Sequence, residues 1–143
     1  MNHDEVMSLY EDQAELFRTL GDAYRLRILA LLRVREACVC ELVTLLPISQ
    51  PAVSQHLRRL RQAGLVRERR HKYWTYYALR DDLPAEVRTF VAALPIAPED
   101  AAWLRTHHVD ATCAVLKVEG GESSPAERAE VRMGIGSSAR GEG

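Results

Sequence analysis

Two cysteines that stand two residues apart, Cys38 and Cys40, are the side chains of this sequence best suited to chemistry. Thiolates bind soft, thiophilic ions in preference to Mg²⁺ or Ca²⁺, and a helix N-terminus lowers the pKa of a thiol, which supplies thiolate near neutral pH. The pair therefore indicates a site for a thiophilic metal or metalloid. The alternative is two buried, inert cysteines, because cysteine is among the most buried residue types.

The pair is predicted to open a short helix from about Val39 to Leu46, which Pro47 stops because proline disfavours helical geometry in the residue before it. Residues i and i+2 of a regular helix point about 200° apart, so their sulfurs do not normally face each other. One ion can hold both sulfurs only where the helix has not begun, or by unwinding its first turn. Ligation is therefore expected to deform this helix and to act as a switch on the helix that follows.

Two helices are predicted to precede the pair. Apolar residues at helical spacing run from Tyr10 to Leu20, and Gly21 marks the end of that helix. Asp22 is a natural cap for the second helix, which carries an apolar stripe around Ile28. The arginines of this second helix are expected to face solvent or DNA, and they are Arg25, Arg27, Arg33 and Arg35.

The helix that follows the pair has both of its ends marked in the sequence. Ser49 is a suitable N-cap, Pro51 lies in the first turn, where its missing N–H costs nothing, and Gly64 is a natural left-handed terminator. The apolar face of this helix consists of Val53, Leu57 and Leu60. Only a few residues around Pro47 join it to the preceding helix, which is the helix-turn-helix pattern.

A change of hydrophobic period after Gly64 predicts a β-hairpin. Residues 65–66 start a strand, residues 70–72 form a polar tip, and residues 73–79 return as an aromatic strand. A hairpin directly behind a helix-turn-helix is a wing. The expected fold is therefore mainly α with a small β-hairpin, a winged helix-turn-helix that dimerises through its terminal helices.

The chain is expected to hold one such domain between tails. We predict an N-terminal tail over residues 1–8, the DNA-binding and dimerisation domain over 9–96, an extension with a short helix over 97–118, and a disordered tail over 119–143, where Gly, Ser, Glu and Arg dominate. No apolar run reaches membrane-spanning length, and the first residues are polar and acidic, so we expect no membrane contact, no signal peptide and a cytoplasmic location in which thiols stay reduced.

The charge of the chain is unevenly distributed. The formal net charge is −1, yet residues 49–74 carry +6 and residues 1–22 carry −5. A basic segment of this kind is the electrostatic footprint of a nucleic-acid binder, with an ordinary solvated face as the alternative. Base edges would be read in the major groove by the helix after Ser49, and phosphates would be contacted by the wing. The residues expected to bind DNA are Ser49, Gln50, Ser54, Gln55, His56, Arg58, Arg59, Arg67, Arg69, Arg70, His71 and Lys72.

A single module of this size covers little DNA, so such proteins commonly dimerise and read a double-stranded operator with two-fold symmetry. The first and fifth helices are the candidates for the homodimer interface. The fifth is predicted over residues 83–94, with Pro84 near its start and Pro95 just beyond its end, and a sixth is predicted over residues 98–107. The apolar stripe expected to face the partner consists of Leu83, Val87, Phe90, Val91 and Leu94.

Several separated motifs of the chain resemble the ArsR/SmtB family of metalloregulatory repressors. They are residues 17–22 (FRTLGD), 37–42 (ACVCEL), 49–57 (SQPAVSQHL) and 63–66 (AGLV), and the resemblance spans about residues 16–94. Within that family a C-V-C-[DE]-L box implies sensing of As(III) or Sb(III), or of cadmium and lead where cysteines precede it. No cysteine precedes Cys38 here, so the resemblance implies As(III) or Sb(III) as inducer, with other thiophilic ions as alternatives.

The resemblance departs from the family pattern at one position. Arsenite sensors with this box often carry a third cysteine where Val43 stands, and trivalent arsenic prefers three sulfurs. Cys113 is the one other cysteine of the chain and is the candidate third ligand, with two thiolates and a non-protein ligand as the rival arrangement. The family's zinc site on the fifth helix is not expected, because no histidine lies between Lys72 and Leu94.

Three other interpretations remain open at this stage. A small thiol oxidoreductase or arsenate-reducing enzyme is disfavoured, since the chain lacks a C-x-x-C motif, a phosphate-binding loop and alternating strands and helices. A winged-helix repressor could instead use the cysteines as a redox switch. A plain winged-helix module with inert cysteines is the third interpretation.

Overall fold

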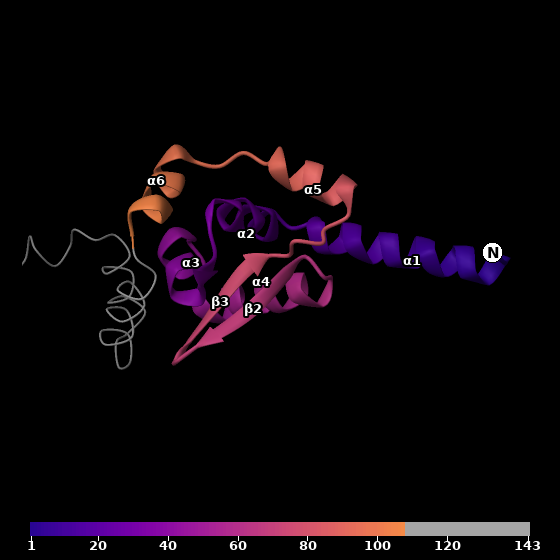
Figure 1. The fold of residues 1–143 in the computed structure, drawn as a ribbon, viewed down its shortest axis with the longest axis horizontal. Helices are drawn as coiled ribbons and strands as arrows, with labels where there is room; N and C mark the ends of the chain where they lie inside the picture. The colour runs from indigo at the N-terminus through magenta and orange to yellow at the C-terminus, as the bar shows by residue number, and fades with distance from the viewer. Residues whose placement is uncertain (108–143) are drawn as a thin grey trace, which may run out of the picture.

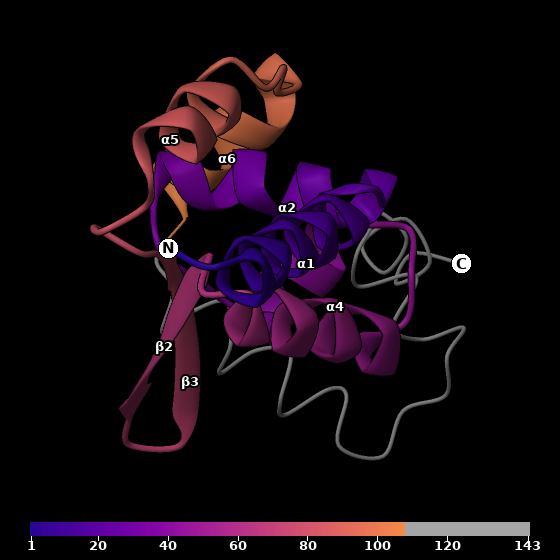
Figure 2. The ribbon, with the colours of Figure 1, turned by 90° about the vertical axis from the view of Figure 1, so that its right-hand side faces the viewer.

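The computed structural model describes residues 1–107, in which the helices pack together and one small antiparallel sheet projects from the helical body (Figure 1). The elements run α1 (His3–Leu20), α2 (Ala23–Val34), β1 (Ala37–Cys38), α3 (Val39–Leu45), α4 (Gln50–Gln62), β2 (Val66–His71), β3 (Trp74–Leu79), α5 (Ala85–Ala92) and α6 (Pro98–Thr106). Helix α2 lies at the centre, with α4 on one side and α5 and α6 on the other (Figure 2). None of the helices in residues 1–107 combines the length and apolar character needed to cross a bilayer.

Helix α1 begins at His3, seven residues before the expected start at Tyr10. A capping box stabilises this end, because Asn2 Oδ1 accepts the N–H of Glu5 at 2.8 Å and Glu5 Oε2 accepts the N–H of Asn2 at 2.7 Å. The added turns extend α1 away from the rest of the molecule (Figure 1). Residues 3–8 are therefore helical, although the sequence analysis assigned them to a tail.

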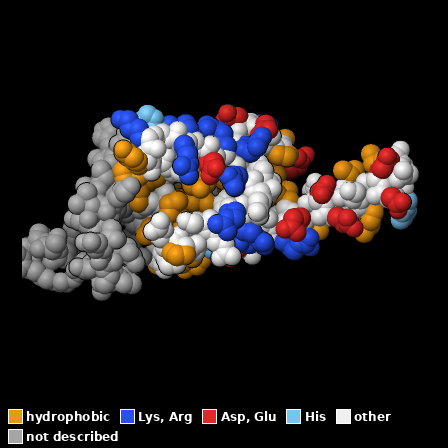
Figure 3. Space-filling model, turned by 90° about the horizontal axis from the view of Figure 1, so that it is seen from below, with side chains coloured by type: hydrophobic (Ala, Val, Ile, Leu, Met, Phe, Trp, Pro, Cys, Tyr) orange, Lys and Arg blue, Asp and Glu red, His pale blue; other side chains and the backbone are white. Residues whose placement is uncertain are grey.

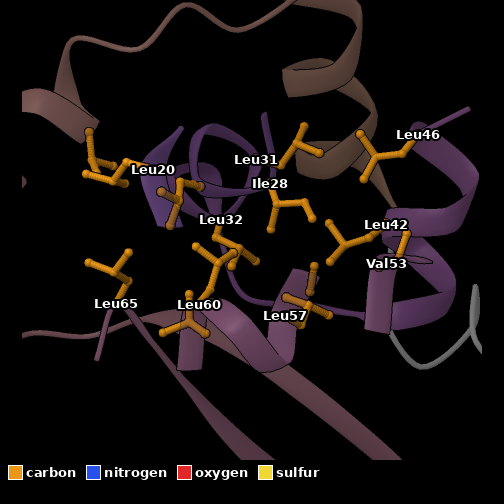
Figure 4. Close-up of a cluster of buried hydrophobic side chains, with 14 of the residues drawn as sticks. Leu20, Ile28, Leu31, Leu32, Leu42, Leu46, Val53, Leu57, Leu60 and Leu65 are labelled. Carbon is orange, nitrogen blue, oxygen red and sulfur yellow. The ribbon is translucent and has the colours of Figure 1, made fainter. Parts of the chain in front are cut away.

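A single hydrophobic core joins α2 to both helices of the helix-turn-helix (Figure 4). The side chains of Ile28 and Leu31 from α2 meet Leu42 from α3, and all three are fully buried. Val53, Leu57 and Leu60 bury the predicted apolar face of α4 in the same core. At about 25 cal/mol for each Å² of apolar surface removed from water, such burial is the main term that fixes α4 to the body.

The ends of α4 are those that the sequence predicts. Ser49 Oγ accepts the N–H of Ala52 at 3.3 Å, and Gly64 has φ +76, a conformation in which glycine is favoured because it has no Cβ. The N–H of Leu65 then bonds the carbonyl of Leu60, and that of Gly64 bonds the carbonyl of Arg61, which is a Schellman motif. The helix-turn-helix is thus closed by local hydrogen bonds at both ends of its second helix.

The wing has one strand more than expected. Strands β2 and β3 form the predicted hairpin, with His71 opposite Trp74 at its tip. The two-residue strand β1 pairs with the other edge of β3, which gives the order β1-β3-β2. Because β1 contains Cys38, the first cysteine of the pair belongs to the wing sheet, while Cys40 lies in α3.

The arginines of the α2 segment do not face solvent or DNA as predicted. Arg33 donates from Nη1 to the carbonyls of Val91, Ala92 and Leu94, at 2.6, 3.1 and 2.8 Å, at the end of α5. Arg27 reaches Asp100 in α6 at 3.0 Å, and Arg25 donates to the Thr19 carbonyl at 2.6 Å. These guanidinium groups satisfy carbonyls that helix ends leave without intrahelical partners, so they hold the helices together.

The apolar stripe of α5 packs largely inside its own chain. Val87 and Val91 are buried against the central core, as is Leu83 just before the helix, and Leu94 packs on the same core. Only Phe90 of the predicted stripe stays exposed, at 43%. Helix α1 instead presents exposed apolar side chains, which are Met7, Leu9, Tyr10 and Phe17.

Candidate functional site

The sulfurs of Cys38 and Cys40 touch, with their Sγ atoms 2.7 Å apart. Cys38 is the N-cap of α3, in an extended conformation with φ −91 and ψ 167, and Cys40 lies in the first turn of the helix. The 200° divergence of a regular helix therefore does not apply, because the helix has not begun at Cys38. Of the two arrangements that the sequence allowed, the structure contains the one that needs no unwinding.

Glu41 holds the backbone of Cys38 in this position. Its carboxylate is fully buried and accepts the N–H of Cys38 at 3.1 Å through Oε1. Arg35 neutralises it, with Nη1 3.1 Å from Oε1 and Nη2 2.6 Å from Oε2. A bidentate arginine is the partner that a buried carboxylate requires, because an unpaired charge in the interior is costly.

Two aromatic residues of the wing strand β3 cover the cysteine pair. Cys38 and Tyr76 form a buried cluster, 2% and 3% exposed, on which Cys40 and Trp74 pack. The remaining access to the sulfurs is beside Cys40 and Trp74, which are both half-buried. The pair is therefore two largely enclosed sulfurs with an apolar wall, and sulfur is a donor suited to a soft ion.

The described part of the chain supplies two ligands and not three. Within residues 1–107, no group of three or more His, Cys, Asp and Glu side chains is placed to hold a metal ion. The nearby carboxylate of Glu41 is turned towards Arg35. The predicted third ligand, Cys113, lies outside the described residues.

The exposed face of α4 carries the side chains expected to read bases. Gln50, Gln55, Arg58 and Arg59 are exposed, Ser49 is exposed while it caps the helix, and Ser54 is half-buried. Seen from below, Lys and Arg side chains are spread over the body of the molecule with some acidic ones among them, while the charged side chains of the projecting α1 are mainly acidic (Figure 3). The charge separation in the sequence is thus also a separation in space.

His56 is turned towards α2. Its Nδ1 lies 3.3 Å from Arg25 Nη1, and its Nε2 lies 3.9 Å from a carboxylate oxygen of Asp22. Burial raises the pKa of Asp22, but the N–H groups of Arg25 and Tyr24 and the nearby cationic side chains outweigh it, so the pKa is held below its ordinary value of 3.8. The histidine therefore helps to dock α4 on the start of α2.

The wing cations are exposed, and two of the arginines at this face form ion pairs. Arg67, Arg70, His71 and Lys72 are all exposed. Arg69 lies 4.7 Å above the centroid of the Tyr76 ring and bonds Glu36 at 2.5 Å. On the neighbouring edge, Arg61 of α4 bonds Glu68 of β2 at 2.6 Å.

The residues that support the cysteine pair were not predicted from the sequence. Glu41 had a readable signal, since it stands three residues after Cys38, the spacing of a capping box. Tyr76 had none, because its contact with Cys38 bridges residues far apart in the chain. Arg35 was misassigned to the solvent face.

The sequence comparisons identify regulators of transcription. Residues 22–68 match the model of the family described as "Bacterial regulatory protein, arsR family". The chain is similar to the arsenic resistance transcriptional regulator ArsR1 of Pseudomonas putida, at 39% identity over 62% of this chain and 69% of that protein. It is similar to the transcriptional repressor SmtB homolog of Synechocystis, at 45% identity over 54% of this chain and 61% of that protein. These matches are regulators and not enzymes, so the enzyme alternative is excluded.

Among solved structures, the chain resembles the homodimeric winged helix-turn-helix DNA-binding domain of Mb0332 from Mycobacterium bovis. The TM-score is 0.56 at 25% identity, over 76% of this chain and 95% of that chain. The predicted fold class is therefore confirmed.

Proposed function

The chain belongs to the arsR family of bacterial regulatory proteins, and on that premise we propose that it represses transcription until a thiophilic ion, As(III) or Sb(III), binds Cys38 and Cys40. The observation that carries the proposal is the contact of the two sulfurs at the N-cap of α3, one short helix before the exposed basic face of α4. An effector site formed by this pair would lie next to the helix that reads DNA.

Binding of arsenous acid needs no oxidant or reductant. Each thiol that replaces a hydroxyl group of As(OH)₃ forms an S–As bond and gives its proton to the departing hydroxyl, which leaves as water. Two thiols of the pair replace two hydroxyls in this way. The apolar wall of Tyr76 and Trp74 limits the return of water to the arsenic.

Cys113 is our candidate for the third sulfur, and the packing of Arg35 supports it. The same guanidinium that grips Glu41 also donates to the carbonyl of His107 at 3.2 Å. Cys113 is the sixth residue after His107, and a chain of that length spans at most about 20 Å. The third ligand can thus come from the same chain as the pair, without a partner subunit.

The DNA-bound form is proposed to be a homodimer on a double-stranded operator. Gln55 and Arg58 of α4 would read base edges, while Arg70 and Lys72 of the wing would contact phosphates. The exposed apolar side chains of α1 and Phe90 of α5 are the proposed dimer surface, since the rest of the predicted α5 stripe is used by the chain's own core.

A redox switch is the second candidate, and one specific observation favours it. Sulfurs in direct contact are also placed to form a disulfide on oxidation. The two candidates differ in the reagent that releases the protein from DNA. Arsenite release under strict exclusion of oxygen supports ligation, and peroxide release under exclusion of metals supports oxidation.

The test is an operator titration with the full chain and the DNA upstream of its own gene, followed by fluorescence anisotropy. Arsenite is expected to weaken binding of the wild type, while Cys38→Ser and Cys40→Ser retain binding and lose the response. Cys113→Ser distinguishes three protein sulfurs from two sulfurs with a non-protein ligand. If Cys113 is the third ligand, this variant should bind arsenite more weakly than the wild type. Arsenite release of the Cys38→Ser, Cys40→Ser double variant equal to that of the wild type contradicts the proposal. A cadmium or zinc response larger than the arsenite response would change the proposed ion but not the proposed site.

A further inference from the structure

One row of cross-strand partners runs across the three-stranded sheet. Cys38 in β1 stands opposite Tyr76 in β3, and Tyr76 stands opposite Arg69 in β2. Residues directly opposite each other in an antiparallel pair project from the same face of the sheet. A thiol of the effector site, an aromatic ring and a wing guanidinium are thus neighbours in one row.

Both contacts in this row are made by side chains. Tyr76 and Cys38 share a buried cluster, and the Arg69 guanidinium lies 4.7 Å above the ring of Tyr76, within the range of a cation–π interaction. Glu36, the residue directly before β1, also binds Arg69, because its carboxylate accepts a hydrogen bond from Arg69 Nη2 at 2.5 Å. Arg69 is therefore held by Glu36, which directly precedes β1, and by Tyr76 of β3, which packs on Cys38.

We propose that Tyr76 and Glu36 are positioning residues through which the cysteine pair controls the wing, by setting the place of Arg69 on the DNA backbone. This inference rests on the proposed function. In the ion-free protein, Tyr76 and Glu36 hold Arg69 where it contacts a phosphate. Ligation at the pair displaces Tyr76 and the short strand β1, and Arg69 moves with them.

Packing and pairing explain why the displacement is transmitted. The two sulfurs touch, so an ion bound to both must move them apart, and Cys38 is packed directly against Tyr76. Close-packed interiors pass such a change to their neighbours, and Tyr76 is the neighbour on the wing side. Strand β1 has two residues and pairs along one edge only, so little hydrogen bonding resists its movement.

The rival route runs through α3 alone. Leu42 and Leu46 pack in the core shared with α4, so a shift of α3 could reposition α4 without any change in the wing. The two routes differ in the salt dependence of DNA binding. Loss of one phosphate contact reduces the magnitude of the slope of log K against log salt by about 0.9, or by about 2 when both subunits of a dimer lose the contact. A misplaced α4 instead acts mainly on sequence discrimination.

The experiment compares full-length variants in operator titrations over a range of salt, with and without arsenite, and measures arsenite binding separately by thiolate–arsenic absorbance. Tyr76→Leu removes the ring and Glu36→Gln removes the charge, while Tyr76→Phe keeps the ring. Tyr73→Leu and Glu68→Gln are the matched controls, because Tyr73 is exposed at the wing tip and Glu68 pairs with Arg61. Glu36 is partly exposed, so its variant remains informative if Tyr76→Leu does not fold.

We expect arsenite to lower the salt slope of the wild type by about 2. Tyr76→Leu and Glu36→Gln should bind arsenite as the wild type does, start with the lower slope, and lose at least tenfold of the arsenite response. Tyr76→Phe and both controls should respond like the wild type. An arsenite response of Tyr76→Leu or Glu36→Gln equal to that of the wild type overturns the inference and leaves the proposed function intact. Absence of an arsenite response in the wild type overturns both.

Discussion

Arg35 donates hydrogen bonds from both of its terminal nitrogens to the fully buried carboxylate of Glu41, at 3.1 and 2.6 Å. The same carboxylate accepts the N–H of Cys38. Breaking a buried pair from one side leaves the other charge uncompensated, at a cost of about 3–5 kcal/mol. Because Arg35 keeps some exposure to water, we expect Glu41→Gln to lower the free energy of unfolding by about 3 kcal/mol. Urea denaturation measures this change.

The control for Glu41→Gln is Glu68→Gln, which removes an ion pair that is roughly 40% exposed on both sides. Exposed pairs contribute about 0–1 kcal/mol, so its effect should stay within that range. Equal effects of the two variants would show that the buried pair does not stabilise the site.

Arg33 is predicted to stabilise the fold and not to bind DNA. Its Nη1 donates to three carbonyls at the end of α5. Because hydrogen bonds from charged groups contribute about 1.5–3 kcal/mol each and these three share one donor, Arg33→Ala should cost about 2–3 kcal/mol of stability. Operator affinity at a temperature where the variant is fully folded should not change. A reduced salt slope for Arg33→Ala would place this side chain on the DNA instead.

The exposed face of α4 is predicted to read sequence, and the wing tip is predicted to contribute affinity alone. Gln55→Ala should cost about 1–3 kcal/mol for each contact and relax specificity at one base position of each half-site. Arg70→Ala should weaken all sequences alike and reduce the magnitude of the salt slope by about 2, one phosphate contact for each subunit of the dimer. Titrations of operator and unrelated DNA distinguish these effects. Arg105→Ala, an exposed arginine of α6, is the control and should change neither quantity.

The N-cap of α2 should make stability depend on acid. The Asp22 carboxylate accepts the N–H groups of Tyr24 and Arg25 at 2.9 and 3.1 Å, and its pKa in the folded protein lies below 3.8. A lowered folded pKa stabilises the protein above the unfolded value, and the contribution is lost as pH falls through the folded pKa. Asn also caps helices, so Asp22→Asn removes mainly the charge at the helix N-terminus, about 0.3–1 kcal/mol.

The measurement for Asp22→Asn is the free energy of unfolding from pH 7 to pH 2. The wild type should be more stable at neutral pH, and the two proteins should converge as the pH falls through the lowered folded pKa of Asp22. Asp81→Asn, in the exposed turn before α5, serves as the control and should stay within about 0.5 kcal/mol of the wild type. A difference that grows towards low pH would contradict the assigned direction.

Helix α1 is predicted to form the dimer. Phe17 is 69% exposed, and Met7, Leu9 and Tyr10 lie exposed on the same helix. Phe17→Glu places a charge in the proposed interface, which should shift sedimentation velocity towards the monomer and lower operator affinity at least tenfold. Tyr73→Glu, at the exposed wing tip, is the control for an exposed aromatic and should stay dimeric. An unchanged dimer for Phe17→Glu would move the interface elsewhere.

Local patterns predicted most of the architecture. The helix-turn-helix, its cap at Ser49, the left-handed Gly64 and the hairpin after it all follow from hydrophobic period and from residues that act on their immediate neighbours. The early start of α1 also has a local signal, the capping box of Asn2 and Glu5, which could have been recognised in the sequence. The cysteine pair, too, was placed correctly at the start of the third helix.

The sequence by itself determined which helices form, where the basic reading face lies and that two thiols stand before it. The tertiary structure alone decided what surrounds those elements. It turned Arg33 and Arg35 inwards, used most of the α5 stripe for the chain's own core, and set Tyr76 between Cys38 and Arg69. The physical reason is that caps and periodicity act over a few residues, whereas the partner of a charge, a ring or a sulfur depends on segments that meet only after the chain folds.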